Sequence, residues 1–87
     1  MRHGDSLRSA PPVQEMSDAR QAIAAAEEAA AEDLAPEPLN DARRFLETAE
    51  ELLRQEAYGG ARINAVRAKN RAVQALEASQ EAAADSD

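Results

Sequence analysis

The chain has 87 residues, a net charge of −7 and no cysteine. This length limits the protein to one small domain, and the missing thiols exclude a disulfide and a thiolate metal site. The negative charge argues against DNA or RNA as a main partner, because binding to phosphates needs a positive surface. Alanine supplies 22 of the residues, so we expect strong local helix formation but little hydrophobic burial per residue.

Groups that could perform catalysis are scarce. The single histidine, His3, lies near the start of the chain, and the three glycines form no phosphate-binding loop. A nucleophile needs a base within hydrogen-bond reach. Neighbouring acids such as Glu27 and Glu28 point away from each other on a helix, which predicts a solvated acidic face. We therefore expect a protein that is not an enzyme and that holds no cofactor and no metal.

Residues 1–16 are expected to form a flexible tail or tether. The first six residues have no apolar period, and residues 1–10 are either native or vector-derived. Val13 and Met16 could extend the first helix, since the prolines before them are tolerated in a first turn. Nothing near Met1 resembles a signal peptide. We expect either a cytosolic chain or a mature form whose leader was removed.

Two helices are expected in the first two thirds of the chain. The first covers residues 17–33, with Ser17 as its N-cap and apolar residues recurring in steps of three and four. Proline at Pro36 ends that pattern and suits the first position of the second helix, residues 36–55. The apolar stripe of the first helix consists of Ala19, Ala22 with Ile23, Ala26, and Ala29 with Ala30. That of the second consists of Leu39, Ala42, Leu46, Ala49 and Leu53.

The third helix is expected over residues 58–83, after a turn at residues 55–60 that contains Gly59 and Gly60. Residues 84–87 are expected to fray, because their acids lie at the unfavourable end of the helix dipole. Small residues recur along this helix in steps that alternate between three and four, as in a heptad pattern, and they predict its buried face. The members of this seam are Ala61, Ala65, Ala68, Ala72, Ala75 and Ser79.

Short turns between helices favour antiparallel neighbours. The sequence therefore predicts an all-α fold, an antiparallel up-down-up three-helix bundle over residues 17–83 with alanine-rich, close-packed seams. The third helix is the longest and should overhang its partners. Its seam either packs inside the monomer, or its overhanging part, residues 72–83, pairs with another copy or another protein.

Charge is distributed unevenly along the chain. Residues 17–56 hold 11 acids and 4 bases, whereas residues 57–76 hold four bases and no acid. This pattern predicts either a basic helix that pairs with the acidic helices beside it or a docking surface for an anionic partner. The candidate interaction residues are Arg62, Asn64, Arg67, Lys69, Arg71 and Gln74. Four of them share one helical face: Asn64, Arg67, Arg71 and Gln74.

Three segments carry a family resemblance that covers residues 13–83. They are Asp18–Ile23, the step Leu34–Leu39 with its Ala-Pro-Glu-x-Leu spacing, and Tyr58–Arg62. Together they resemble a family of bacterial envelope proteins catalogued as domain of unknown function 4398. The family usually has a Gly-Asp type turn before the tyrosine, whereas this chain has Glu56 and Ala57, which leaves the start of the third helix open. The hairpin at Tyr58 and Ala61 also resembles a tetratricopeptide hairpin.

The resemblance implies a non-enzymatic helical scaffold or protein-interaction module of the bacterial cell envelope. Similar proteins are secreted lipoproteins of Gram-negative bacteria, some with an OmpA-like peptidoglycan-binding domain. It implies a periplasmic location, with an outer-membrane anchor on a precursor cysteine absent from this chain; the alternative is cytoplasmic. The expected partner is a protein or a second copy. The alternative function is binding of an anionic envelope component, a peptidoglycan peptide or lipid head group, by the third helix's basic face.

Overall fold

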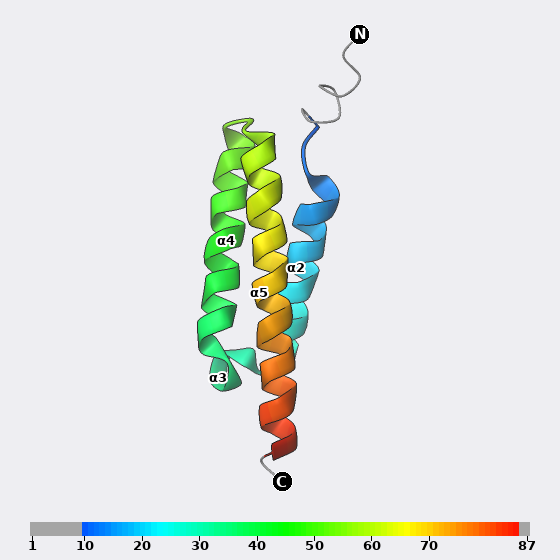
Figure 1. Ribbon diagram of the computed structural model, residues 1–87, viewed down its shortest axis with the longest axis vertical. Coiled ribbons are helices and arrows are strands. Elements are labelled where there is room, and N and C mark those ends of the chain that lie inside the picture. The colour runs from blue at the N-terminus through cyan, green and yellow to red at the C-terminus, as the bar shows by residue number, and fades with distance from the viewer. Residues whose placement is uncertain (1–9, 86–87) are drawn as a thin grey trace.

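A computed structural model describes residues 10–85, and these residues form helices without any strand. The expected all-helical fold is confirmed. There are four helices within the described residues: α2 (Val13–Glu28), the short α3 (Ala31–Leu34), α4 (Pro36–Arg54) and α5 (Tyr58–Asp85). In Figure 1, α2 and α5 run in the same direction, α4 runs in the opposite direction, and α5 lies between them.

The first helix begins earlier than expected. Residues 1–16 were predicted as a tail and Ser17 as the N-cap, but α2 starts at Val13, with Pro12 as its N-cap residue. The amide of Met16 donates to the carbonyl of Pro12 at 3.0 Å, and Met16 is 2% exposed. Its burial beside Ala49 explains the earlier start, because tertiary packing stabilises this added turn. The predicted tail over residues 1–9 lies outside the described residues.

The predicted helix over residues 17–33 is also broken near its end. Ala30 has φ +65°, a left-handed conformation, and the chain resumes there as α3. Alanine favours helix at every position here, so local propensity cannot cause the break. Ala31 and Ala35 are 0% and 6% exposed and belong to the same buried cluster as Ala72 and Ala75 of α5. The break therefore folds α3 against α5 as the chain passes from α2 to α4.

The start of α4 follows the expected proline pattern. Pro36 occupies the first turn, and the helix ends at Arg54, one residue before the predicted end. The turn that follows differs from the expectation, because its left-handed residue is Glu56, with φ +61°, and not a glycine. Gly59 and Gly60 instead lie in the first turns of α5. At Gly60 a Cβ atom would lie 3.2 Å from Leu52 Cδ1, so the missing side chain allows α4 and α5 to approach closely.

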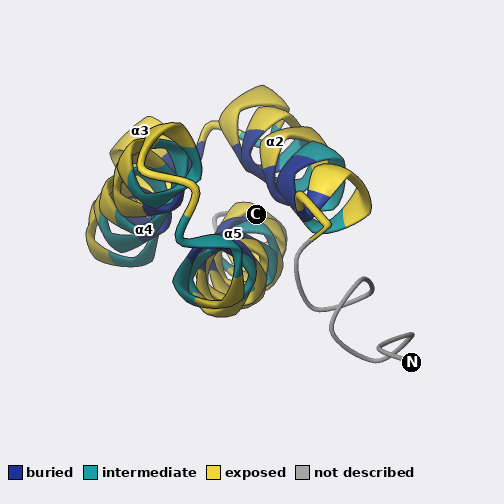
Figure 2. Cartoon of the chain, turned by 90° about the horizontal axis from the view of Figure 1, so that it is seen from above, coloured by how far each residue is buried: buried dark blue, intermediate teal, exposed yellow. Residues whose placement is uncertain are grey.

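The core of the molecule is the seam of α5. All six predicted seam residues are buried with no exposed surface: Ala61, Ala65, Ala68, Ala72, Ala75 and Ser79. In Figure 2 the buried parts of α2 and α4 lie on the sides of these helices that face the rest of the molecule. Of the two alternatives for the later part of the seam, packing inside the monomer holds for the residues up to Ser79, because α3 contacts α5 there. The seam residues through Ser79 are therefore covered inside the monomer, and α5 continues to Asp85 beyond them.

Candidate interaction surface

Arg62 joins the first turn of α5 to the start of α2. Its Nε lies 3.4 Å from Glu15 Oε2, and its Nη2 donates to the carbonyl oxygen of Ala10 at 3.4 Å. Both charged side chains are about one third exposed, at 34% each. This contact agrees with the first of the two alternatives for the charge pattern, in which bases of the last helix pair with acids of the neighbouring helices.

Arg71 makes the corresponding contact with α4. Its Nη1 donates to Asp41 Oδ2 at 2.8 Å, and its guanidinium carbon lies 5.9 Å from the centre of the Phe45 ring. Asp41 also accepts a hydrogen bond from Arg44, one turn further along α4. Because the pair is partly exposed, its contribution to stability is modest, and its main effect is to fix how α5 faces α4.

The other four predicted residues have no ionic partner among residues 10–85. Asn64 donates to the carbonyl of Gly60 at 2.9 Å, one turn back in its own helix. Arg67, Lys69 and Gln74 are exposed, and the described part of the chain offers them no hydrogen bond or ion pair. The side chains of Arg67 and Lys69 are therefore available to solvent and to a partner.

The structure does not bring all six predicted residues onto one surface. At 100° per residue, Asn64, Arg67, Arg71 and Gln74 lie on the side of α5 that faces α4 and solvent. Arg62 faces α2, and Lys69, seven residues later, lies on that same side. The six predicted residues therefore form two separate surfaces. Four of them lie beside α4, and the two bases Arg62 and Lys69 lie beside α2.

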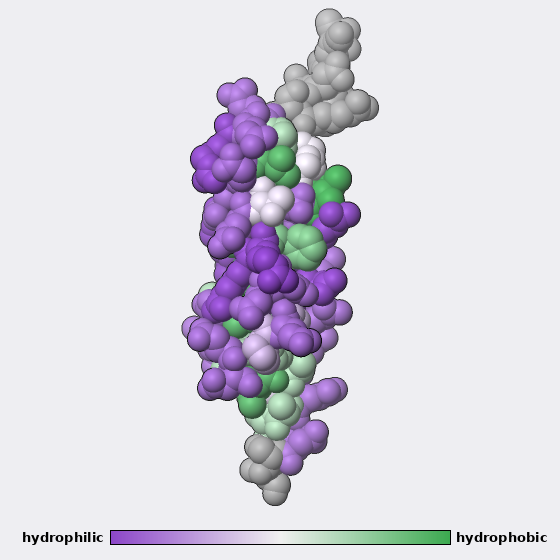
Figure 3. Space-filling model, turned by 90° about the vertical axis from the view of Figure 1, so that its left-hand side faces the viewer, coloured by the Kyte–Doolittle hydropathy of each residue, from purple (hydrophilic) through white to green (hydrophobic). Residues whose placement is uncertain are grey.

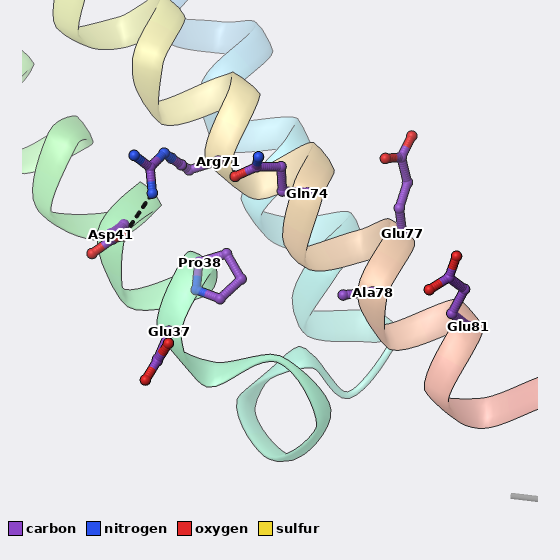
Figure 4. Close-up of a pocket in the computed structure, with 8 residues that line it drawn as sticks. All are labelled: Glu37, Pro38, Asp41, Arg71, Gln74, Glu77, Ala78 and Glu81. Carbon is purple, nitrogen blue, oxygen red and sulfur yellow. Dashed lines mark hydrogen bonds and ion pairs between the residues drawn. The ribbon is translucent and has the colours of Figure 1, made fainter. Parts of the chain in front are cut away.

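A shallow hollow of about 440 Å³ runs between the first turns of α4 and the second half of α5 (Figure 4). Its apolar surface comes from Pro38 and Ala78, and its polar lining holds one base and four acids. The lining residues are Glu37, Pro38, Asp41, Arg71, Gln74, Glu77, Ala78 and Glu81. The acids escaped the sequence interpretation, although Glu77 and Glu81 continue the spacing that Gln74 and Arg71 begin.

Carboxylates outnumber bases in this hollow, which bears on the ligand it could hold. Asp41 is paired with Arg71, whereas Glu77 and Glu81 make no ion pair within residues 10–85. In Figure 4 both glutamates extend away from the Arg71–Asp41 pair. The surface drawn in Figure 3, which includes α4, is mainly hydrophilic, with apolar atoms in small separate areas. The hollow therefore favours a cationic group over an anion.

Arg43 of α4 connects α2 and α3. Its Nη2 donates to Glu27 Oε2 of α2 at 2.8 Å and to Glu32 Oε1 of α3 at 3.2 Å. These hydrogen bonds, first from Glu27 and then from Glu32, raise the pKa of the Arg43 guanidinium above its ordinary value. One arginine of α4 thus holds the end of α2 and the short α3 together across the left-handed break.

Neither a spanning helix nor a metal-binding cluster is found in residues 10–85. None of the described helices is both long enough and apolar enough to cross a membrane. Within the same residues, no three side chains of histidine, cysteine, aspartate or glutamate gather where they could hold a metal ion.

Comparison with known proteins supports the family resemblance carried by the Ala-Pro-Glu-x-Leu step and the Tyr58 hairpin. The sequence profile described as Domain of unknown function (DUF4398) matches residues 14–87, most of the chain. Neither the curated proteins nor the solved structures compared with the chain match it. On the basis of the profile match, this chain belongs to the DUF4398 family.

Proposed function

We propose that this chain is a non-enzymatic helical scaffold or protein-interaction module of the bacterial cell envelope. Its working unit is an antiparallel up-down-up bundle of α2, α4 and α5, with α3 as a clasp at one end. The observation that carries the proposal is the fully buried seam of α5, six residues from Ala61 to Ser79. Because the seam residues fill the interior by packing against the other helices, a partner would bind to the polar outer surfaces.

The length of α5 suits a spacer. Its 28 residues span about 42 Å at the rise of an α-helix. Both α2 and α4 pack along it, which limits bending of the longest element. A rod of this kind holds two attached partners at a fixed separation. The face of the molecule drawn in Figure 3 is mainly polar, and a protein can dock there.

The location is tested on the full-length precursor expressed in a Gram-negative host. We expect metabolic labelling with a fatty acid to mark the precursor and cell fractionation to place it in the outer membrane. Replacing the precursor's lipidated cysteine by serine should remove the label and release the protein to the periplasm. An unlabelled protein in the cytoplasmic fraction contradicts the envelope assignment.

The interaction role is tested with the immobilised chain and a bacterial envelope extract. We expect a stoichiometric protein partner whose retention falls when the outer surface is changed by Arg67→Glu. The matched control is Arg54→Glu, which makes the same charge change at the exposed C-terminal end of α4. A chain that retains no protein but turns over a substrate contradicts the proposal.

A second candidate function is binding of an anionic envelope component, such as a peptidoglycan peptide or a lipid head group. It is favoured by the exposed Arg67 and Lys69, which lack an acidic partner among residues 10–85. The engagement of Arg62 by Glu15 and of Arg71 by Asp41 reduces the charge left for such a ligand. Sedimentation with purified peptidoglycan or anionic vesicles tests it. If Arg67→Glu with Lys69→Glu leaves binding unchanged, these bases are not the binding surface.

A further inference from the structure

We propose that two copies of this chain pair antiparallel through the outward side of α5, about a two-fold axis at Gln74. The proposal names a partner for the interaction module proposed above and so rests on that function. It uses the exposed side of α5 and not the seam, which is covered by α2, α3 and α4.

The charges on this side of α5 mirror each other about Gln74 with opposite sign. Arg71 and Glu77 each lie three residues from it, and Arg67 and Glu81 each lie seven residues from it. Steps of three and four keep all five residues on one side of the helix. A second α5 in the opposite direction therefore places Arg67, which has no ion pair within residues 10–85, beside Glu81 of the other copy. Arg71, which also binds Asp41 of its own copy, comes near Glu77 of the other copy. By symmetry every such contact occurs twice.

The hollow beside α4 strengthens this complementarity. Glu37 and Asp41 on its α4 side add to Glu77 and Glu81 on its α5 side, against the single base Arg71. The first half of α5 carries the opposite excess, because it holds no acid. The basic half of one copy thus meets the acidic hollow of the other.

Of the two exposed apolar residues in the first half of α5, Val66 meets an apolar residue in this arrangement, whereas Ile63 falls opposite Asp85 of the second copy. Ile63 and Val66 are 53% and 42% exposed on the first half of α5. Pairing about Gln74 places Val66 opposite Ala82 of the second copy, and Asn70 opposite Ala78 of the second copy. The small side chains of Ala78 and Ala82 allow the two helices to approach. A parallel pairing instead places Arg67 against Arg67 and Glu81 against Glu81, which like charges oppose.

Charge exchange with sedimentation equilibrium tests the pairing. Arg67→Glu and Glu81→Arg should each weaken the dimer by about tenfold, because each creates like-charge contacts at two symmetric places. The Glu81→Arg result is diagnostic, since this change lowers the net negative charge and so reduces general repulsion between copies. The double variant R67E/E81R keeps the net charge of −7 and should restore the dimer.

Controls separate the pairing from general charge effects and from unfolding. Arg54→Glu changes the net charge as Arg67→Glu does, at an exposed position away from this side, and should leave the dimer unchanged. Circular dichroism confirms that each variant is folded. A wild-type chain that sediments as a monomer up to about 1 mM overturns the proposal, as does a double variant that stays dissociated. Retention of a different envelope protein would then still support the proposed function.

Disulfide trapping determines the direction and the axis of pairing. This chain of 87 residues has no cysteine, so an introduced cysteine is the one thiol that can form a disulfide. Gln74→Cys should form a covalent dimer under mild oxidation, because its two copies meet at the axis. Arg67→Cys alone should not, whereas a mixture of the Arg67→Cys and Glu81→Cys chains should cross-link. Cross-linking of Arg67→Cys alone as fast as Gln74→Cys overturns the antiparallel arrangement.

Discussion

The methyl side chains of the α5 seam determine how closely the helices approach. Ala61, Ala65 and Ala68 are each 0% exposed, and so are the later seam residues. A methyl group removes little area from water, so each position contributes modestly to the hydrophobic effect. Close packing along the whole seam supplies the rest through dispersion contacts. Stability in this chain therefore depends on side chains being small at these positions.

Enlarging a seam residue tests this dependence. We expect Ala68→Leu to lower the free energy of unfolding by about 1–3 kcal/mol or more, because the added atoms force α2 and α4 away from α5. Urea denaturation followed by circular dichroism measures the change. The control is Asn70→Leu on the exposed side of the same helix. Equal changes in the free energy of unfolding for the two substitutions would show that the seam accommodates a larger side chain without strain.

Ser79 is the one seam residue with a hydroxyl. Its Oγ is buried and has no hydrogen-bond partner within residues 10–85. An unsatisfied buried polar atom costs about 1–3 kcal/mol. Ser79→Ala should therefore raise the midpoint of thermal unfolding. Gln80→Ala, at the exposed neighbouring position, controls for the higher helix propensity of alanine. A gain no larger than that of Gln80→Ala would mean that the hydroxyl costs nothing.

The exposed pair of Glu51 and Arg54 gives a pH-dependent prediction. Hydrogen bonds, first from Arg54 and then from Gln55, lower the pKa of the Glu51 carboxyl below its ordinary value. A lowered pKa in the folded state stabilises the fold above the unfolded pKa, and this stabilisation is lost as pH falls through the folded value. Arg54→Gln should raise the pKa of Glu51, as measured by carboxyl NMR titration. An unchanged titration would mean that the pair does not persist in solution.

At the scale of elements, the connection between α2 and α4 is the most distinctive feature. Ala30 adopts φ +65°, which a residue with a Cβ atom enters at a cost of about 1–2 kcal/mol. This cost is offset by the burial of Ala31 and Ala35 and by the bonds of Arg43 to Glu27 and Glu32. The short helix α3 therefore owes its position to contacts with α4 and α5 and not to its own four residues.

Glycine scanning at the break tests this account. Ala30→Gly should stabilise the protein by about 0.5–1 kcal/mol, because glycine enters the left-handed region without steric cost. Ala29→Gly, where φ is −85°, should destabilise it by a similar amount. Chemical denaturation of the two variants gives the comparison. Destabilisation by both would indicate that Ala30 does not hold the left-handed conformation in solution.

At the scale of the whole molecule, residues 10–85 contain two buried clusters along one axis. Met16, Ala49 and Ala65 form the cluster near the α4–α5 turn, and the larger cluster surrounds Leu39 at the other end. Leu46 packs against both clusters, so they are physically continuous. Beyond Ser79 the residues of α5 are partly or fully exposed. The last turns of this helix therefore add length without adding core.

Shortening the chain distinguishes these regions. A chain that ends after Ser79 should keep cooperative unfolding with a small loss of stability, because every buried residue remains. It should also dimerise more weakly than the full chain, since the contacts between Arg67 and Glu81 are lost. A chain that ends after Arg71 loses the seam residues that α3 covers and should unfold or become largely flexible. Thermal denaturation and sedimentation measure both properties. A fully stable chain ending at Arg71 would contradict the assigned core.

Much of this architecture could be predicted from the sequence, because spacing and helix propensity are local properties. The six-residue seam of α5 and the proline start of α4 follow from residue order, whereas Glu56 and Ala57 left the start of α5 open. The predicted interaction surface was only partly informative. The sequence identifies Arg62 and Arg71 as basic, but it cannot show that Glu15 and Asp41, 47 and 30 residues away, lie beside them.

By itself the sequence determined that the chain is helical, which sides of its helices are apolar and which family it resembles, since these depend on neighbours within a few residues. Only the tertiary structure decided that α2 begins at Val13, that the chain breaks at Ala30 and that α3 closes the seam. It also decided that acids gather beside α4. The physical reason is that burial and ion pairing join residues far apart in the chain, and an alanine-rich stretch favours helix equally at every position.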